Sequence, residues 1–244
     1  MPEVPADPWE RYASWWQENF TAGKDPEYEE QILPLFREHL AGAGSVLDVG
    51  CGEGQLARMA APLAQAVVGV DPSAAQLAEA VRRGGGVSYL RGRAEALPFR
   101  DASFDVVTVC LVLEHILDLD RVLDELARVI APGGRLLLAM NHPLLQAPGS
   151  GWIDDHILGE QYWRVGSYLT EEVSEEEVDK GIFFPFVHRP LHRYLNGLAT
   201  RGLYLTWMAE PPPPSGFLER AAEYRLAAEI PRLCFLRAEK LKVF

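Results

Sequence analysis

Apolar runs alternate with helical patterns between residues 45 and 141, and this alternation limits the fold more than any other feature of the chain. The runs that read as strands are 45–49, 66–70, 87–90, 104–113 (a central strand with its exit loop) and 135–140. Helix formers with capping residues fill the segments between them, as at Asp118 or Asp120 ahead of Val122. Strands that alternate with helices form a parallel sheet covered on both faces. We therefore predict an α/β fold with a doubly wound, mostly parallel sheet.

The segments on either side of this core have a different texture. We expect a single domain, 1–244, made of an N-terminal helical segment (1–44), the core (45–142), an insertion (143–189) and a C-terminal part (190–244) with a helix and the last strands. The insertion is loop-rich and too long for an ordinary connection, so it predicts a lid or a substrate wall. Its acidic run, Glu171 to Asp179, predicts a solvated helix face rather than a binding site.

Charge and cysteine content disfavour several classes of protein. The net charge of −12, from 23 basic and 35 acidic residues, argues against a nucleic-acid partner. No apolar run approaches the roughly 20 residues of a membrane helix, and the first residues lack the features of a signal peptide. We therefore expect no membrane insertion and a cytoplasmic protein. Cys51, Cys110 and Cys234 lie in or beside apolar runs, which predicts buried thiols and no metal site.

A glycine-rich turn marks the candidate ligand site. Gly50-x-Gly52-x-Gly54 follows a strand and precedes a helix, so its backbone can approach a ligand closely. Asp71 ends the next strand, near the distance at which an acidic residue meets ribose hydroxyls. Asp48 precedes the glycines, and a carboxylate there suits a positively charged ligand better than a pyrophosphate.

Four segments of the chain resemble, in the same order, the motifs of class I S-adenosylmethionine-dependent methyltransferases. These segments are Val46–Gly54, Val68–Ser73, Ala94–Phe99 with Ser103–Val107, and Leu126–Leu136. The resemblance is greatest to the small-molecule branch that contains the ubiquinone and menaquinone methyltransferases. It implies a Rossmann-like, seven-stranded sheet with an antiparallel last strand, and S-adenosyl-L-methionine as the cofactor.

The resemblance also implies a cofactor site, residue by residue. Its members would be Asp48, Gly50, Cys51, Gly52, Asp71, Pro72, Ala94, Glu95, Leu111 and Val112. Asp71 would accept both ribose hydroxyls, and Asp48 would face the ammonium group of the methionine part or a bridging water. Ala94, with Glu95 nearby, would meet the adenine edge. Arg93 stands where relatives often have Asp or Asn, and it cannot accept from the adenine amino group.

An in-line methyl transfer needs a general base only if the acceptor is protonated. His142, after the fifth strand run, is the first candidate, and His115, after the fourth, is the second. Further candidates in the insertion are Asp154, Asp155, His156, Glu160 and Tyr162. The acceptor is expected to be a small molecule, amphipathic or cationic, and Tyr162 and Trp163 are expected to cover the methyl group.

Three other functions compete with this interpretation. A nicotinamide-dependent oxidoreductase could use the same glycine turn, but Asp48 and the Leu97-Pro98-Phe99 block argue against it. A cofactor-binding regulator without catalysis is compatible with the same motifs. A nucleic-acid methyltransferase is disfavoured by the acidic balance and by the residues that follow the fourth strand run. The acceptor atom (oxygen, nitrogen or carbon) and the oligomeric state stay open at this level.

Overall fold

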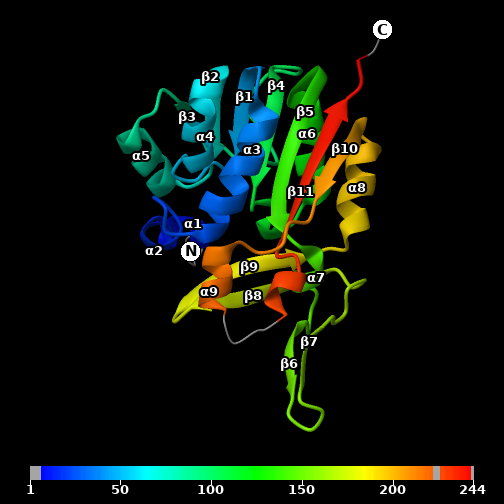
Figure 1. The fold of residues 1–244 in the computed structure, drawn as a ribbon. Helices are drawn as coiled ribbons and strands as arrows, with labels where there is room; N and C mark the ends of the chain where they lie inside the picture. Colours follow the sequence, from blue (N-terminus) through cyan, green and yellow to red (C-terminus); the bar gives the residue numbers. More distant parts are fainter. Residues whose placement is uncertain (1–6, 222–225, 243–244) are drawn as a thin grey trace, which may run out of the picture.

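The computed structural model describes residues 7–221 and 226–242. Within them, seven strands form one sheet in the order β10-β11-β5-β4-β1-β2-β3 (Figure 1). Their bounds are β1 Ala43–Val49, β2 Ala64–Asp71, β3 Ser88–Arg91, β4 Phe104–Cys110, β5 Ile130–Asn141, β10 Leu203–Ala209 and β11 Leu233–Lys240. The strands β1 to β5 are parallel, and β11 is antiparallel to both of its neighbours. The predicted α/β fold with an antiparallel last strand is confirmed.

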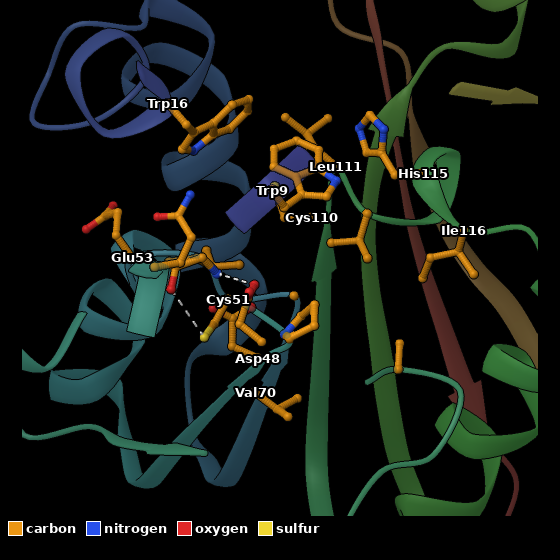
Figure 2. Close-up of a pocket in the computed structure, with 18 of the residues that line it drawn as sticks. Trp9, Trp16, Asp48, Cys51, Glu53, Val70, Cys110, Leu111, His115 and Ile116 are labelled. Atoms are coloured by element: carbon orange, nitrogen blue, oxygen red, sulfur yellow. Dashed lines mark hydrogen bonds between the residues drawn. The ribbon is translucent and has the colours of Figure 1, made fainter. Parts of the chain in front are cut away.

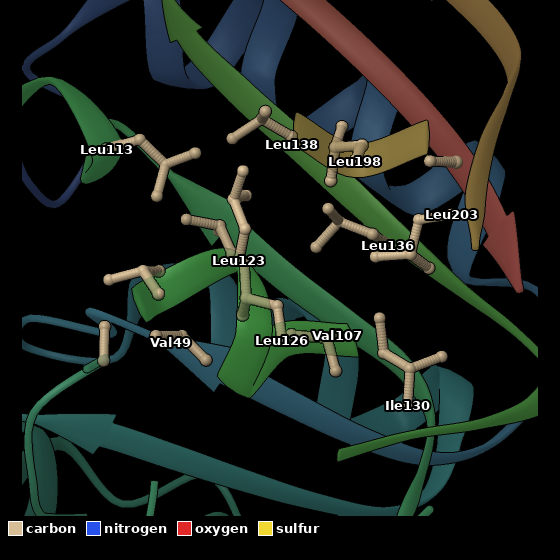
Figure 3. Close-up of a cluster of buried hydrophobic side chains, with 14 of the residues drawn as sticks. Val49, Val107, Leu113, Leu123, Leu126, Ile130, Leu136, Leu138, Leu198 and Leu203 are labelled. Carbon is tan, nitrogen blue, oxygen red and sulfur yellow. The ribbon is translucent and has the colours of Figure 1, made fainter. Parts of the chain in front are cut away.

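Helices cover both faces of this sheet because their apolar stripes match the strands beneath them. On one face α6 (Leu119–Val129) and α8 (Leu191–Ala199) pack over a core that includes Leu126 and Leu198 (Figure 3). On the other face the π-turn η1 (Tyr28–Ile32), α3 (Leu33–Leu40) and α4 (Gln55–Ala60) bury a second cluster. Asp118 caps α6 by accepting the Arg121 N–H at 3.1 Å, as one of the two predicted caps.

Four further helical segments lie at, or begin near, the carboxyl ends of the parallel strands. The N-terminal helices α1 (Pro8–Arg11) and α2 (Ala13–Asn19) contact α5 (Ala74–Arg83), which follows β2. The short turn η3 (Leu113–His115) follows β4. Because the carboxyl ends of parallel strands meet at one edge, these segments surround the place where a doubly wound sheet binds its ligand.

The insertion differs from its prediction. Residues 143–189 were expected to be loop-rich, but they form α7 (Pro143–Gln146) and two hairpins. The hairpin strands are β6 Gly151–Asp155 with β7 Glu160–Arg164, and β8 Glu172–Asp179 with β9 Ile182–His188. The β8–β9 hairpin lies below the carboxyl ends of the parallel strands, whereas β6–β7 projects away from the body of the molecule (Figure 1).

The acidic run was wrongly predicted to be helical, although it is solvated as expected. Its residues form β8, which pairs with the apolar strand β9. The pairing with Phe184 and Phe186 on β9 overrides the helix propensity of a glutamate run, because strand preference depends mainly on what a strand packs against.

The C-terminal part completes the sheet. The tetraproline Pro211–Pro214 separates β10 from β11, and α9 (Ser215–Arg220) and η4 (Ala227–Glu229) lie between them. The Gln31 side chain donates to the Pro212 carbonyl, which joins this segment to the N-terminal helices. None of the helices in the described part of the chain is long and apolar enough to cross a bilayer.

Candidate functional site

A pocket of about 320 Å³ opens at the carboxyl ends of β1, β2 and β4 (Figure 2). This volume lies within the usual range for small-molecule sites, roughly 300–1,000 Å³. All ten residues predicted to bind the cofactor line it: Asp48, Gly50, Cys51, Gly52, Asp71, Pro72, Ala94, Glu95, Leu111 and Val112. The structure therefore brings these residues together, while the role of each stays a prediction.

The glycine turn after β1 forms the floor of the pocket. Gly50, Gly52 and Gly54 all have positive φ, at 70°, 52° and 81°, which explains the residue type at each position. A Cβ at Gly50 would stand 2.4 Å from a methyl carbon of Val112, so a larger residue would also collide with the pocket wall. The Gly52 N–H donates to Asp71 Oδ2 at 2.9 Å and joins the turn to the end of β2.

Asp71 is 7% exposed, and the protein uses only part of its hydrogen-bonding capacity. Oδ2 accepts from Gly52, and Oδ1 accepts the Ser73 N–H at 2.8 Å. Burial raises the pKa of this carboxyl to about 6, although the two N–H donors oppose the rise. Each oxygen keeps a lone pair, so the carboxylate can accept two further hydrogen bonds, as a pair of neighbouring hydroxyls would offer.

Asp48 is a second buried carboxylate, 2% exposed. Its Oδ1 accepts the Thr108 hydroxyl at 2.8 Å, whereas its Oδ2 is buried without a hydrogen-bond partner. Burial raises the pKa of Asp48 to about 7. An unpartnered buried carboxylate oxygen is costly. A ligand with an ammonium group, directly or through water, would satisfy it, and a pyrophosphate would be repelled.

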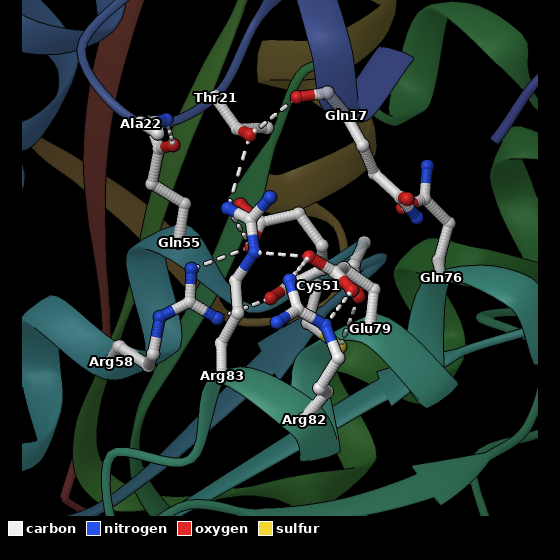
Figure 4. A network of polar contacts seen from close by, with 12 residues as sticks. Gln17, Thr21, Ala22, Cys51, Gln55, Arg58, Gln76, Glu79, Arg82 and Arg83 are labelled. Carbon is white, nitrogen blue, oxygen red and sulfur yellow. Dashed lines mark hydrogen bonds and ion pairs between the residues drawn. The ribbon is translucent and has the colours of Figure 1, made fainter. Parts of the chain in front are cut away.

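An ion-pair network beneath the glycine turn was not foreseen (Figure 4). Glu53 is 2% exposed and pairs with Arg58 at 2.5 Å and with Arg83 at 2.8 Å. Arg83 also donates to the Thr21 hydroxyl at 3.0 Å. The network therefore ties the turn, α5 and the end of the N-terminal helices together. The only signal in the sequence was an acid inside the glycine turn, which has no obvious partner until the fold is known.

The N-terminal helices supply an aromatic wall that the sequence analysis left unassigned. Trp9, Trp16, Phe20 and Tyr28 line the pocket (Figure 2 draws Trp9 and Trp16). The rings of Trp16 and Phe20 stack with centroids 4.4 Å apart. Glu10 fixes α1 in place, because its carboxylate accepts from the Ser73 hydroxyl at 2.6 Å and the Ala75 N–H at 3.2 Å. The aromatic cluster near the start of the chain was the signal that could have found this wall.

His115 lines the pocket at its other end, beside Trp9, with ring centroids 4.8 Å apart. Its Nδ1 lies 2.8 Å from the Pro185 carbonyl oxygen, which can only accept, so Nδ1 carries the hydrogen and Nε2 keeps a lone pair. Burial lowers the pKa of His115 to about 4. The imidazole is therefore neutral near pH 7 and can accept a hydrogen bond at Nε2.

His142, the first candidate for a general base, is not a lining residue. Its Nδ1 accepts the Leu144 N–H at 3.1 Å and caps α7, and its Nε2 lies 2.7 Å from Glu210. Both ring nitrogens are thus engaged outside the pocket. By capping α7, the His142 imidazole points away from the pocket.

Arg93 lines the pocket and forms an ion pair with Glu95 at 3.1 Å, so the charge of this unusual arginine is already paired.

The insertion contributes little to the pocket. Within residues 143–189, all of which the structure describes, Pro185 is the sole lining residue. Tyr162 and Trp163 lie on the projecting hairpin and do not cover the pocket, and the other insertion candidates do not line it: Asp154, Asp155, His156 and Glu160. These residues belong to the β6–β7 hairpin, whereas Pro185 lies on β9 of the other hairpin.

The three thiols are free and buried, as predicted, and Cys51 and Cys110 face the pocket. Burial raises the pKa of both of these thiols well above its usual range, so neither is a thiolate near neutral pH. No group of three or more potential metal ligands occurs among the described residues.

Comparisons with known proteins agree with this geometry. A family model described as a methyltransferase domain matches residues 47–138. A probable S-adenosylmethionine-dependent methyltransferase of Mycolicibacterium smegmatis is 36% identical over 111 residues, 46% of this chain and 43% of that protein. A ubiquinone biosynthesis O-methyltransferase of Rhizobium rhizogenes is 32% identical over 169 residues, 67% of this chain and 63% of its own length.

Solved structures match over more of the chain. An S-adenosylmethionine-dependent methyltransferase from Mesorhizobium loti superimposes with a TM-score of 0.74 and 26% identity, over 88% of this chain and 98% of that one. A related structure from Listeria monocytogenes gives a TM-score of 0.74 and 25% identity over 89% and 97%. By sequence, however, the matched segment spans less than half of the first curated relatives, 43% and 46% of their lengths.

Proposed function

We propose that this protein, whose residues 47–138 match a methyltransferase domain, transfers the methyl group of S-adenosylmethionine to a small-molecule acceptor. The observation that carries the proposal is the pair of buried carboxylates, Asp48 and Asp71, with hydrogen-bonding capacity that the protein leaves unused at the edge of the sheet. A cationic nucleoside with a free ribose diol matches both.

The residues of the pocket fit the cofactor in a definite order. Asp71 would accept the two ribose hydroxyls, and Asp48 Oδ2 would accept from the ammonium group. The turn leaves room for the methionine part at Gly52, where a Cβ would meet nothing within 4 Å and would occupy that space. Ala94 and Glu95 would border the adenine, while Leu111 and Val112 would pack on the opposite side. When bound, the cofactor supplies an electrophilic methyl group on a sulfonium centre.

The protein's contribution to the transfer is orientation and a hydrogen-bond acceptor. Trp9, Ile116 and Pro185 give the end of the pocket near His115 an apolar wall, which suits a largely apolar acceptor. The neutral His115 would accept, at Nε2, the hydrogen of the acceptor's attacking group and so hold that group in line. The N-terminal helices exclude water from the same space.

Two alternative functions, an oxidoreductase and a non-catalytic regulator, fit the residues of the pocket less well. Asp48 would face the pyrophosphate of a nicotinamide cofactor with an unpartnered carboxylate oxygen, which disfavours an oxidoreductase. A regulator that binds the cofactor without turnover would use the same carboxylates, but it has no need of a neutral imidazole at the far end. Transfer of a radiolabelled methyl group to candidate acceptors separates a regulator from an enzyme.

Titration calorimetry tests the binding step directly. We expect S-adenosylmethionine and S-adenosylhomocysteine to bind with micromolar dissociation constants, corresponding to about 8 kcal/mol, and NAD not to bind measurably. Binding of NAD without binding of either adenosyl ligand would overturn the proposal.

A further inference from the structure

The β6–β7 hairpin is a feature of the insertion that the proposed function does not use. It projects from the body, and none of its residues lines the pocket (Figure 1). Apart from β6, no strand in the described part of the chain pairs with β7. A two-stranded hairpin on its own is marginally stable in water, and an unpaired edge is a template for another strand. The unpaired edge of β7 is therefore available to pair with a strand of another chain.

The solvent face of β7 carries a short charge pattern. Glu160, Tyr162 and Arg164 alternate with inward residues and are exposed, Tyr162 by 44%. Large apolar side chains are exposed at both ends of the strand. At the hairpin tip Ile157 is 95% and Leu158 69% exposed, and past the end of β7 Val165 is 45% exposed. Such a group of exposed apolar residues indicates an interaction surface.

We propose that β7 pairs with β7 of a second copy of this chain, antiparallel about a two-fold axis at Tyr162, so that the two hairpins form one four-stranded sheet. In this register Glu160 lies opposite the partner's Arg164, and the symmetry repeats the pair. The edge then has the three or more strands that independent stability needs.

Other registers lose this complementarity. An antiparallel pairing centred on Glu160 or on Arg164 places like charges opposite each other, and so does a parallel pairing. Pairing through β6 instead leaves Asp154 and Asp155 without an opposite basic residue, because β6 contains none. The Tyr162-centred register is therefore the one that the charges of this hairpin select.

The same register also covers the exposed apolar residues. It places Leu158 at the tip of one hairpin opposite the partner's Gly166, and Val165 opposite the partner's Gly159. The tip of each copy thus lies along the base of the other, and Gly159, where a Cβ would meet nothing within 4 Å, leaves room for the partner's Val165. The charges thus select the register, and that register brings Leu158 and Val165 toward the partner copy.

Sedimentation equilibrium of the full chain tests this dimer with matched charge variants. We expect a monomer–dimer equilibrium with appreciable dimer at about 100 µM, as suits a small interface. Glu160→Lys and Arg164→Glu each set like charges opposite one another twice, so each should raise the dissociation constant at least about tenfold. The double variant restores opposite charges in reversed order and should return to within about threefold of the wild type.

Cysteine cross-linking tests the register itself. All three native thiols are buried, so Tyr162→Cys introduces the accessible one at the two-fold axis, where facing Cα atoms come within about 5.5 Å. Mild oxidation should give a disulfide-linked dimer. Val81→Cys, on the 65% exposed Val81 of α5, should not.

A wild-type monomer at this concentration would overturn the proposal. So would a dimer that the charge variants leave unchanged, or Tyr162→Cys cross-linking no faster than Val81→Cys. Because the hairpin does not line the pocket, all these variants should bind S-adenosylhomocysteine like the wild type. A failure of the dimer is therefore distinct from a failure of the proposed function.

Discussion

Asp48 and Asp71 stand at the ends of neighbouring strands, and a parallel sheet brings their side chains to the same edge. The protein supplies each with some hydrogen bonds and leaves others unmade. Single residues of this kind could be named from the sequence, because the glycine turn and the strand ends fix their positions. Their hydrogen-bond partners could not, since Thr108 is 60 residues from Asp48.

Asp71→Ala should weaken S-adenosylhomocysteine at least tenfold. The substitution removes two charge-assisted hydrogen bonds to the ribose, each worth roughly 1.5–3 kcal/mol. Calorimetry measures the loss, with Asp101→Ala as a control at an exposed carboxylate that pairs with Arg128. An affinity unchanged in Asp71→Ala would place the ribose elsewhere.

The pH dependence of Asp48 has a definite sign. The pKa of Asp48 is about 7 in the folded chain and near its ordinary 3.9 in the unfolded chain, so between these values the folded state holds a proton that the unfolded state has lost. The free energy of unfolding that Asp48 contributes therefore falls as pH rises from about 4 to 7. Asp48→Asn should lose less thermal stability than the wild type between pH 5 and pH 8.

Ligand binding should respond in the opposite direction. The ammonium group needs the ionised carboxylate, so the affinity of the wild type for S-adenosylhomocysteine should rise over this range. The affinity of Asp48→Asn should change less, and both proteins keep His115 and Asp71, so the difference isolates Asp48. Parallel pH profiles for the two proteins would contradict this assignment.

At the scale of elements, the sequence predicted what local pattern determines. Strand runs, the glycine turn and the Asp118 cap lie within single segments, and the structure confirms them. The hairpins could not be predicted in the same way, because β8 depends on its pairing with β9. The aromatic wall was missed for a related reason: α1 and α2 are placed at the pocket by contacts with α5 and β9, which lie far along the chain.

Glu10→Ala should loosen α1 at the mouth of the pocket. The side chain accepts two hydrogen bonds from the start of α5, and these bonds lower the pKa of Glu10. Because α1 carries Trp9, we expect amide exchange in residues 8–19 to quicken and S-adenosylhomocysteine affinity to fall about three- to tenfold. The matched control is Glu38→Ala on α3. Unchanged exchange and affinity would show that Glu10 does not hold the helix.

Across the whole molecule, different parts of the chain form different sides of the pocket. The parallel strands and their turns present the carboxylates and glycines, the N-terminal helices close one side, and Pro185 of β9 holds His115 at the other. The β6–β7 hairpin lies outside this arrangement, where we propose that it joins two copies. Pocket and projecting hairpin can therefore be tested independently.

A crystal structure of the protein with S-adenosylhomocysteine would show whether Asp48 and Asp71 bind the cofactor as proposed. Both ribose hydroxyls should lie within hydrogen-bond distance of the Asp71 carboxylate, and the ammonium group should bind Asp48 directly or through one water. The sulfur should face the end of the pocket that holds His115. Density for the nucleoside away from the ends of β1 and β2, with Asp48 Oδ2 still unpartnered, would contradict it.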